Sequence, residues 1–542
     1  MRGSDGGKDR FVDRRGFLKN AALVGGGVMT AGPLHALGFR TSHGSAFKRS
    51  NGYGPLVLKG DLWLPQEFNY HVVARQGQLM SDGKPRPGIF DGMAAYRGPK
   101  GTTILILNHE NRERPGEIKV ITGPAYEYDQ AMFGGNTKLR VRRQRDGRHP
   151  DGSPRYTYSV VESFAILGGT STNCAGGVMD RSWVTCEEVV KGPRGTGASF
   201  APKKHGYNFE IRADATGPVK AEPIIAAGRF SHEAVVWSAG ILYQTEDRGI
   251  TPDLRTDKKL IGSVFYRYIP ERFRDDDDDD DRRSRRDRDD DDRRDRDDDD
   301  SDDGRRRRRG RLANTKGKLQ ALKLRNEFHA NMDVGRVVGR PYRVEWIDVP
   351  EPDHDDDTDD RRDRVRGFTP TRIQAQDRGA AFFDRQEGAW LEEGYDDDED
   401  RRVYFDCTTG GALDLGQVWE YDPGHETITL IYESSDPARL QNPDNVVVVP
   451  QTGDIFLQED GDGEQYVRGL TRDGSIYDFA KTATNDTEFC GGCFDPDGHT
   501  LYLNQQGERG GLPDGPPDGQ AVMYAIYGPF GNRRRDDVDD ED

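Results

Sequence analysis

Residues 417–434, QVWEYDPGHETITLIYES, contain two short runs in which apolar and polar side chains alternate. This period of two is expected of β-strands that bury one face. Asp422, Pro423 and Gly424 separate the runs; Pro presets φ for a turn and Gly tolerates a positive φ. The stretch therefore predicts two antiparallel strands, at residues 417–421 and 427–432, joined by a tight turn.

Similar strand and turn signals continue along the chain, with turns at Pro450–Gly453, Thr471–Gly474 and Asp495–Gly498. Strands spaced by about 10 residues and bounded by such turns indicate an all-β sandwich, barrel or propeller. The length favours a β-propeller, and we expect about six blades, although no clean repeat is visible. Further strands are expected at Thr102–Leu107, Arg155–Ser163, Ala234–Tyr243, Ser263–Ile269, Leu319–Leu324, Val403–Phe405, Val446–Val449, Asp454–Leu457 and Leu501–Leu503.

The charge of the chain is concentrated in one block. The formal net charge of the 542 residues is -18, and Asp275–Gly310 holds 19 Asp, 13 Arg, two Ser and two Gly. With no apolar residue, this block is expected to be a disordered insertion, or a calcium- or mineral-binding brush. The propeller domain is expected at 37–532, with a charged tail at 533–542. The acidic balance argues against nucleic acid as a partner.

The N-terminal residues 1–36 resemble a twin-arginine export signal. Arg14 and Arg15 are followed by Phe17, Leu18 and a weakly apolar stretch rich in Gly and Ala. A disordered basic tail is the alternative. The signal predicts the twin-arginine translocation machinery as a partner and a periplasmic or secreted location. No other apolar run approaches the ~18 residues of a membrane helix, so no stable membrane span is expected.

Carboxylates, often paired, recur at the ends of predicted strands. Burying them at one centre is costly unless cations neutralise them. A single such residue fits an exposed loop, but the repeated placement predicts a metal centre. The segments are Asn108–Glu110, Thr185–Glu188, Ser231–Glu233, Thr245–Asp247, Gln386–Gly388, Pro443–Asn445, Gln458–Asp460 and Thr487–Glu488.

Arg385 lies two residues before Glu387, so in an extended segment the two side chains point to one side. A guanidinium beside a metal-bound carboxylate can clamp a phosphate through two parallel donors. The alternative is a structural salt bridge between the two residues.

The chain has five cysteines. Cys490 and Cys493 form a CxxC pair without the second pair of a zinc site, so a local disulfide is expected. Cys186, followed by two glutamates, is the expected metal ligand. Cys174 and Cys407 are expected to be small buried residues.

Ordered segments resemble the family of PhoX-type alkaline phosphatases. The resemblance implies a β-propeller whose central cavity holds Fe³⁺ and Ca²⁺ and hydrolyses small phosphomonoesters. It places Cys186 at the family's iron-binding thiolate and Glu387 at the glutamate of the family's Arg-Pro-Glu-Gly segment. It places Arg385 at the family's phosphate-binding arginine and Asn173 at a substrate contact. The segments include RSWVTCEE (181–188), GRFSHEAVVW (228–237), RQEGAW (385–390), NPDNVVVVP (442–450) and TEFCGGCFDPDGHTLYLNQQG (487–507).

The sequence departs from the family pattern at several places, among them the Asp/Arg block at 275–310 and Gln386, which stands where the family has Pro. The Pro-Trp-Gly that precedes Cys-Glu-Glu in the family is absent after Asn173, where Arg181 is a replacement donor. Cys490 stands where the family has alanine. The expected metal ligands are Cys186, Glu187, Glu233, Glu246, Glu387, Asp444, Glu459 and Glu488.

We therefore expect an exported metal-dependent phosphomonoesterase. A non-catalytic calcium-bound β-propeller, acting as a binding module of the cell envelope, is the alternative. A lactonase-like propeller hydrolase is a third hypothesis.

Overall fold

The computed structural model describes residues 52–253, 259–271, 312–355, 369–392, 401–507 and 519–532. All of them belong to one compact unit, Lys48–Asp542. The expected export signal at 1–36, the Asp/Arg block at 275–310 and the tail at 533–542 lie outside the described residues.

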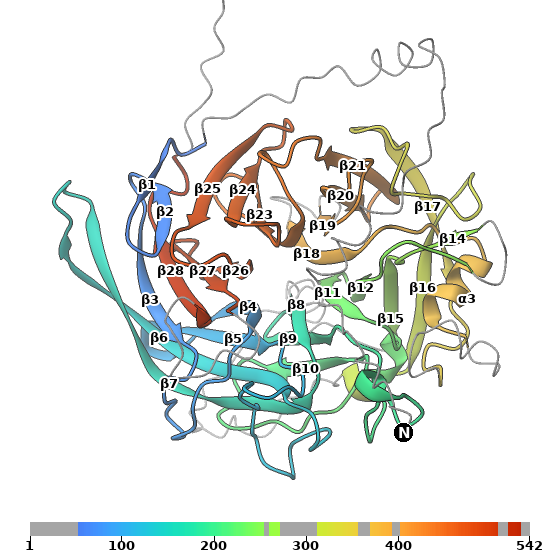
Figure 1. The fold of residues 1–542 in the computed structure, drawn as a ribbon, viewed down its shortest axis with the longest axis horizontal. Coiled ribbons are helices and arrows are strands. Elements are labelled where there is room, and N and C mark those ends of the chain that lie inside the picture. The colour runs from blue at the N-terminus through green and yellow to red at the C-terminus, as the bar shows by residue number, and fades with distance from the viewer. Residues whose placement is uncertain are drawn as a thin grey trace, which may run out of the picture. The chain divides into compact units, whose positions relative to one another are not determined.

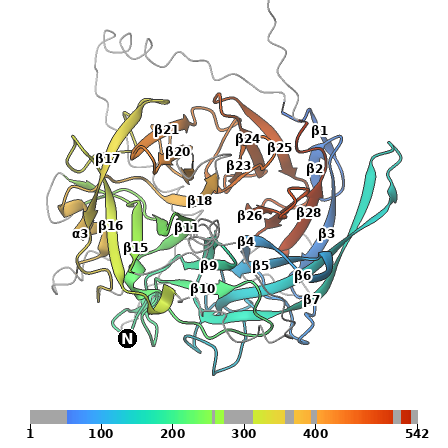
Figure 2. The same cartoon turned by 180° about the vertical axis from the view of Figure 1, so that it is seen from behind.

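Within this unit, six antiparallel blades surround a common axis as a propeller, and two of the blades are joined into one nine-stranded sheet (Figures 1 and 2). Each inner strand contacts the inner strand of the next blade, and the last contacts the first, so the ring closes. The predicted all-β propeller with about six blades is confirmed. The inner strands are β4 (Phe90–Arg97), β8 (Asn173–Met179), β11 (His232–Ser238), β18 (Gln386–Glu392), β22 (Pro443–Val448) and β26 (Phe489–Phe494).

The first three blades follow one another along the chain. Outside β4, the first blade contains β5 (Thr103–His109), β6 (Gly134–Arg148) and β7 (Pro154–Thr170). Outside β8, the second contains β9 (Ser182–Glu187) and β10 (Asn208–Arg212). Outside β11, the third contains β12 (Ile241–Glu246), β15 (Tyr266–Pro270), β16 (Gly317–Leu324) and β17 (Pro341–Asp348).

The fourth blade joins the third at its outer edge, because β17 pairs with β21. Outside β18, it contains β19 (Arg402–Cys407), β20 (Gln417–Asp422) and β21 (Thr427–Glu433). The opening sequence stretch thus forms the β20–β21 hairpin, as predicted. The fifth blade contains β23 (Ile455–Glu459), β24 (Tyr466–Leu470) and β25 (Ile476–Thr482) outside β22, and is extended by β2 (Leu62–Pro65) and β1 (Leu56–Leu58).

The sixth blade combines strands from opposite ends of the described chain. β27 (Thr500–Gln505) and β28 (Val522–Tyr527) follow β26, and the outer strand is β3 (Asn69–Arg75), paired antiparallel with β28. This pairing joins sequence positions more than 400 residues apart and closes the propeller.

Apolar side chains fill the junctions between neighbouring blades. Between the third and fourth blades, Phe265 stacks on Phe405 with ring centroids 4.7 Å apart. Because each blade packs on both faces, inner strands bury nearly every residue, as in β22. This explains why some predicted strands are continuous apolar runs rather than alternating ones.

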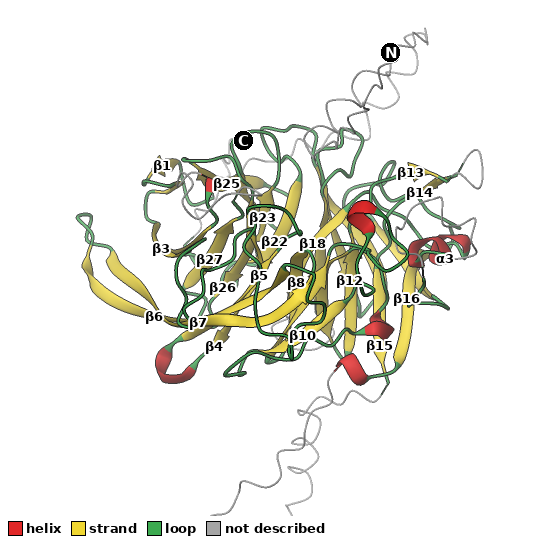
Figure 3. Cartoon of the chain, turned by 60° about the horizontal axis from the view of Figure 1, so that its bottom comes forward, coloured by secondary structure: helices red, strands yellow, loops and turns green. Residues whose placement is uncertain are grey.

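Strands dominate the described structure (Figure 3). The short helix α3 (Thr371–Asp377) and the two-stranded ribbon of β13 (Thr251–Pro252) and β14 (Leu260–Ile261) lie outside the blades. Single 3₁₀ turns occur at Pro99–Gly101, Gly197–Ser199, Ile225–Ala227 and Leu312–Asn314. None of the helices among the described residues is long and apolar enough to cross a membrane.

Candidate metal centre

The second residue of every inner strand is a carboxylate or a thiol. We call these six residues the axial ring, and all six are buried. No clean repeat in the sequence shows that these six residues occupy equivalent positions. Their equivalence becomes visible in the structure, where each is the second residue of its inner strand. The axial ring consists of Asp91, Cys174, Glu233, Glu387, Asp444 and Cys490.

A β-bulge accompanies each axial-ring position. In β11, for example, the register with β12 shifts between His232 and Val235, around Glu233. Equivalent shifts surround the axial-ring residue in β4, β8, β18 and β22, and in β26 the shift begins at Cys490. A bulge bends its strand and re-aims a side chain. The repeated bulge thus explains how six strand ends present their second residue to one centre.

A second set of carboxylates comes from the residues that follow the second strand of the first three blades: Glu110, Glu188 and Asp247. We call them the outer carboxylates. The backbone N–H of each donates to the carbonyl of the residue just before the inner strand, such as Glu188 N–H to Thr172 O at 2.9 Å. The same backbone turn therefore delivers one carboxylate from each of these blades.

These side chains form four overlapping groups. Within each group the potential ligand atoms all lie within 4.8 Å of one another. Because Asp91, Cys174 and Glu188 each belong to two groups, the groups form a continuous arc around the axis. The groups are Asp91–Glu488–Cys490, Asp91–Glu110–Cys174, Cys174–Glu188–Glu233 and Glu188–Asp247–Glu387.

The arc has the electrostatics of a cation site. Both carboxylate oxygens of Glu233 are buried without a hydrogen-bond partner, as is Oε2 of Glu387. Burial, then the nearby Glu387 and Glu188 carboxylates, raise the pKa of Glu233 well above its usual value. Burial and the Glu110 carboxylate likewise raise the pKa of Asp91. Such a cluster is costly without metal, and its oxygen and thiol donors fit both hard cations and transition metals.

Two arginines border the arc. Arg385 donates to Asp247 Oδ1 at 2.9 Å through Nε and to Glu387 Oε1 at 2.5 Å through Nη2. Arg112 donates to Glu110 Oε1 at 2.6 Å and lies 3.6 Å from Glu188. Their side chains remain 22% and 29% exposed, whereas Glu387 and Glu110 are fully buried. An anion that reaches the carboxylates therefore meets guanidinium groups at the edge of the site.

Residues with a left-handed backbone lie next to four of the inner strands. The residues that directly precede β4, β8, β18 and β22 have φ angles between 49° and 54°. They are Ile89, Thr172, Arg385 and Asn442. This conformation is unfavourable for residues with a Cβ, above all for the β-branched Ile89 and Thr172. Strain of this kind concentrates at functional sites.

The expected thiolate ligand, Cys186, lies outside the four groups found among the described residues. Cys186 packs in an apolar cluster with Val235 and Leu242, and burial alone accounts for the raised pKa of its thiol. Cys174 is the small buried residue that was expected, and it also lies among Asp91, Glu188 and Glu233. Cys174 is at the axial-ring position, whereas Cys186 lies in the second strand, which explains the difference.

Three expected carboxylate ligands also lie outside the groups found among the described residues. Glu187, Glu246 and Glu459 are the last residues of β9, β12 and β23, and successive strand residues face opposite sides. Glu187 accepts from the backbone N–H groups of Ser171 and Gly206, and Glu246 from the Tyr266 hydroxyl. Glu459 accepts from Arg468 Nε at 2.9 Å. These carboxylates are held by the protein itself.

The other expected site residues lie at or beside the arc. Glu233, Glu387 and Glu488 belong to its groups. Asp444 is at the axial ring and lies close enough to raise the pKa of Asp91 and Glu233. Asn173 directly precedes Cys174, and its amide is engaged by Thr170 and Thr185.

Asp91, which belongs to two of the candidate groups, is not among the ligands expected from the sequence. Glu110, Glu188 and Asp247 lie within the expected acidic segments but are not among the expected ligands. Two positions in the sequence could have identified these residues. One is the residue that directly follows the second strand of a blade, and the other is a carboxylate near the start of the inner strand that pairs with that second strand. The expected disulfide is also absent: Cys490 and Cys493 are free thiols.

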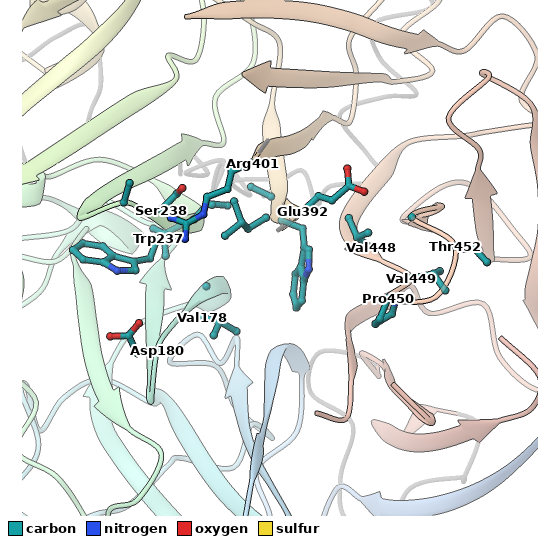
Figure 4. Close-up of a pocket in the computed structure, with 18 of the residues that line it drawn as sticks. Val178, Asp180, Trp237, Ser238, Glu392, Arg401, Val448, Val449, Pro450 and Thr452 are labelled. Carbon is teal, nitrogen blue, oxygen red and sulfur yellow. The ribbon is translucent and has the colours of Figure 1, made fainter. Parts of the chain in front are cut away.

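A cavity of about 980 Å³ lies at the opposite end of the inner strands (Figure 4). In β11, Glu233 is near the start of the strand, whereas Trp237 and Ser238 at its end line the cavity. β8, β18 and β22 show the same arrangement, with Val178, Glu392 and Val448 lining the cavity. At mid-strand, a Cβ on Gly388 would lie 2.7 Å from the Cα of Asn445, so glycine permits the close approach of β18 and β22. The cavity is therefore separate from the carboxylate arc.

Comparison with known proteins identifies the fold and the family. Among solved structures, the chain is similar to "Pseudomonas fluorescens PhoX in complex with vanadate, a transition state analogue", with 16% identity, a TM-score of 0.55, and coverage of 88% of this chain and 98% of that chain. It is also similar to a protein of unknown function from Dyadobacter fermentans, with 9% identity, a TM-score of 0.37, and coverage of 85% and 100% of the two chains. No curated protein matches the sequence. Residues 51–508 match the family described as Alkaline phosphatase PhoX, and the chain therefore belongs to that phosphatase family.

Proposed function

We propose that this phosphatase is an exported, metal-dependent phosphomonoesterase that works at the arc of axial-ring and outer carboxylates. The observation that carries the proposal is Glu233, fully buried with both oxygens unpartnered and surrounded by further carboxylates. A cation is the group that such an arrangement fits. We propose Fe³⁺ and Ca²⁺ as the ions, because the arc combines carboxylates with the Cys174 thiol.

Different side chains have different roles at the proposed site, and the first role is to bind metal ions. Asp91, Cys174, Glu188, Glu233 and Glu387 would hold the metal ions, which when bound supply Lewis-acid stabilisation of charge on phosphate oxygens. Their backbone positions are set by the bulges and turns of the inner strands.

Arg385 and Arg112 bind and orient the substrate. Both border the Glu188–Asp247–Glu387 group, since Arg112 lies 3.6 Å from Glu188 and Arg385 donates to Asp247 and Glu387. A phosphate group at this edge accepts hydrogen bonds from planar guanidinium donors, which stabilise charge that develops on phosphorus-bound oxygens.

Elemental analysis of purified protein, combined with a phosphomonoesterase assay, tests the proposal. We expect bound iron and calcium and hydrolysis of a simple aryl phosphate. Chelation should remove activity and lower the melting temperature, and Glu233→Gln should retain less metal at equal folded content. Protein that contains calcium alone and hydrolyses no phosphomonoester would support the non-catalytic binding module instead.

Export by the twin-arginine route is part of the proposal and is motivated by Arg14 and Arg15. Replacing both with Lys should leave precursor in the cytoplasm, as fractionation would show. Unimpaired export of that variant would contradict the route without affecting the phosphatase assignment.

A further inference from the structure

Cys490 occupies the axial-ring position of the sixth blade. Its thiol and one carboxylate oxygen each of Asp91 and Glu488 all lie within 4.8 Å of one another. The thiol is fully buried, and Asp91, Glu488, Asp444 and Glu110 all lie close enough to act on it electrostatically. The five equivalent positions carry Asp91, Cys174, Glu233, Glu387 and Asp444, which face the same centre. Cys490 therefore completes the ring rather than standing alone near it.

We propose that Cys490 is a metal ligand and that Asp91, Glu488 and Cys490 form a subsite for a transition-metal ion. This inference rests on the metal centre of the proposed function and adds a second cysteine-ligated position to it. Ligation replaces the S–H bond with a sulfur–metal bond and releases the thiol proton to solvent.

The composition of the groups separates their metal preferences. Glu188, Asp247 and Glu387 offer oxygen atoms alone, which suit hard cations such as Ca²⁺. The Asp91–Glu488–Cys490 group contains a thiol, a soft donor that favours transition metals. The two ends of the arc therefore select different classes of cation.

Asp91 links the two thiol-containing positions. The Cys174 Sγ donates to Asp91 Oδ2 at 3.4 Å, while Cys490 lies in the other group that contains Asp91. One carboxylate is thus shared by neighbouring metal positions, each with one cysteine. The unpartnered oxygens of Glu233, which shares a group with Cys174, are independent evidence that this part of the ring is built for cations.

Without metal, the Cys490 thiol donates to the carbonyl of Phe90, with Sγ 3.0 Å from the oxygen. A purely structural thiol would keep that contact. Cys493 provides the matched control, because it lies three residues further along β26 and packs in an apolar cluster with Met93 and Tyr502.

Cobalt(II) is the probe for the test. Full-length protein is stripped with a chelator and reloaded with Co²⁺ alone, and the thiolate-to-cobalt charge-transfer absorption and bound cobalt are measured together. We expect Cys490→Ala to lose about half of the absorption, Cys174→Ala to lose the other half, and Cys493→Ala to lose none. Full absorption in Cys490→Ala would overturn the proposal.

Two further measurements keep the test decisive if an alanine variant does not fold. Cys490→Ser keeps the size of the side chain and should lose the same share of absorption. X-ray absorption at the cobalt edge of unmodified protein should show sulfur neighbours at two positions, and cobalt bound to sulfur at a single position would contradict the proposal.

The phosphomonoesterase assay separates this inference from the proposed function. Wild-type protein that shows both thiolate contributions but hydrolyses no phosphomonoester supports the subsite and refutes the enzyme activity. An active wild type whose absorption does not change in Cys490→Ala supports the activity and refutes the subsite.

Discussion

Arg385 and Glu387 are ion-paired, with Nη2 of the arginine donating to Oε1 of the glutamate at 2.5 Å. The same guanidinium also donates to both carboxylate oxygens of Asp247. Arg385 thus spans two members of one candidate metal group. The sequence left a phosphate clamp and a structural salt bridge as alternatives, and this geometry is compatible with both roles.

Replacing each partner of this pair should separate the two roles. Arg385→Ala should leave bound metal unchanged and lower phosphomonoester hydrolysis by ~10²–10³, about 2.7–4 kcal/mol, through loss of a donor to the transferring group. Glu387→Gln should lower both metal content and rate. Metal analysis and initial rates on the two variants provide the measurement. Loss of metal from Arg385→Ala would show that its role is structural.

Glu187 and Glu188 are adjacent, but substituting them should have different effects on stability and on bound metal. Glu187 accepts from Ser171, Gly206 and Tyr207 backbone N–H groups and from His205, so Glu187→Gln should destabilise the fold by about 3–5 kcal/mol. Glu188→Gln should instead reduce bound metal with little change in the stability of the stripped protein. Urea unfolding of stripped protein and elemental analysis compare them. Equal metal loss in both variants, at equal folded content, would contradict the assignment.

His205 should make the free energy of unfolding fall as the pH rises into the alkaline range. Burial lowers its pKa, but Glu187 at 2.6 Å and Asp129 at 3.5 Å outweigh burial and raise the pKa to about 9. The charged imidazolium therefore stabilises the fold fully below an unfolded-state pKa of about 6.5, and this contribution is lost as pH rises through about 9. The loss amounts to about 3 kcal/mol.

The difference in unfolding free energy between wild type and His205→Gln should accordingly shrink from pH 6 to pH 10. Urea unfolding across that range measures it. A difference independent of pH would mean that His205 is neutral in the folded protein.

Excising residues 275–310 should leave the fold and the activity intact. Pro270 of β15 pairs with Gly317 of β16, and the Glu271 N–H donates to the Lys316 carbonyl, so the described ends of the connection are adjacent in a hairpin. Shortening such a connection changes closure entropy little, about 0.6 kcal/mol for each halving of its length. Thermal unfolding and phosphatase assays of the deletion variant test this, and a large fall in melting temperature would show that the block contributes to folding.

The amino-acid sequence by itself determined the architecture and the chemistry of the donors. Alternating runs with Gly-containing turns, as in QVWEYDPGHETITLIYES, encode strands and hairpins locally, so the all-β class followed from nearby residues. The choice of a propeller rested on the length of the chain and on its resemblance to the family. Acidic residues clustered at strand ends likewise marked the neighbourhood of the metal centre, including Glu233, Glu387 and Asp444.

Only the tertiary structure decided which residue of each acidic segment faces the axis. A shift of one residue along a strand reverses the side to which a side chain points, and the bulges that set this alternation arise from pairing between strands. Glu188 and Cys174, rather than Glu187 and Cys186, therefore lie in the candidate metal groups. Asp91 and Cys490 are about 400 residues apart in the sequence but lie in one group. They meet because the ring closes: β26 contacts β4, and β3 pairs with β28. No local sequence pattern predicts such a contact.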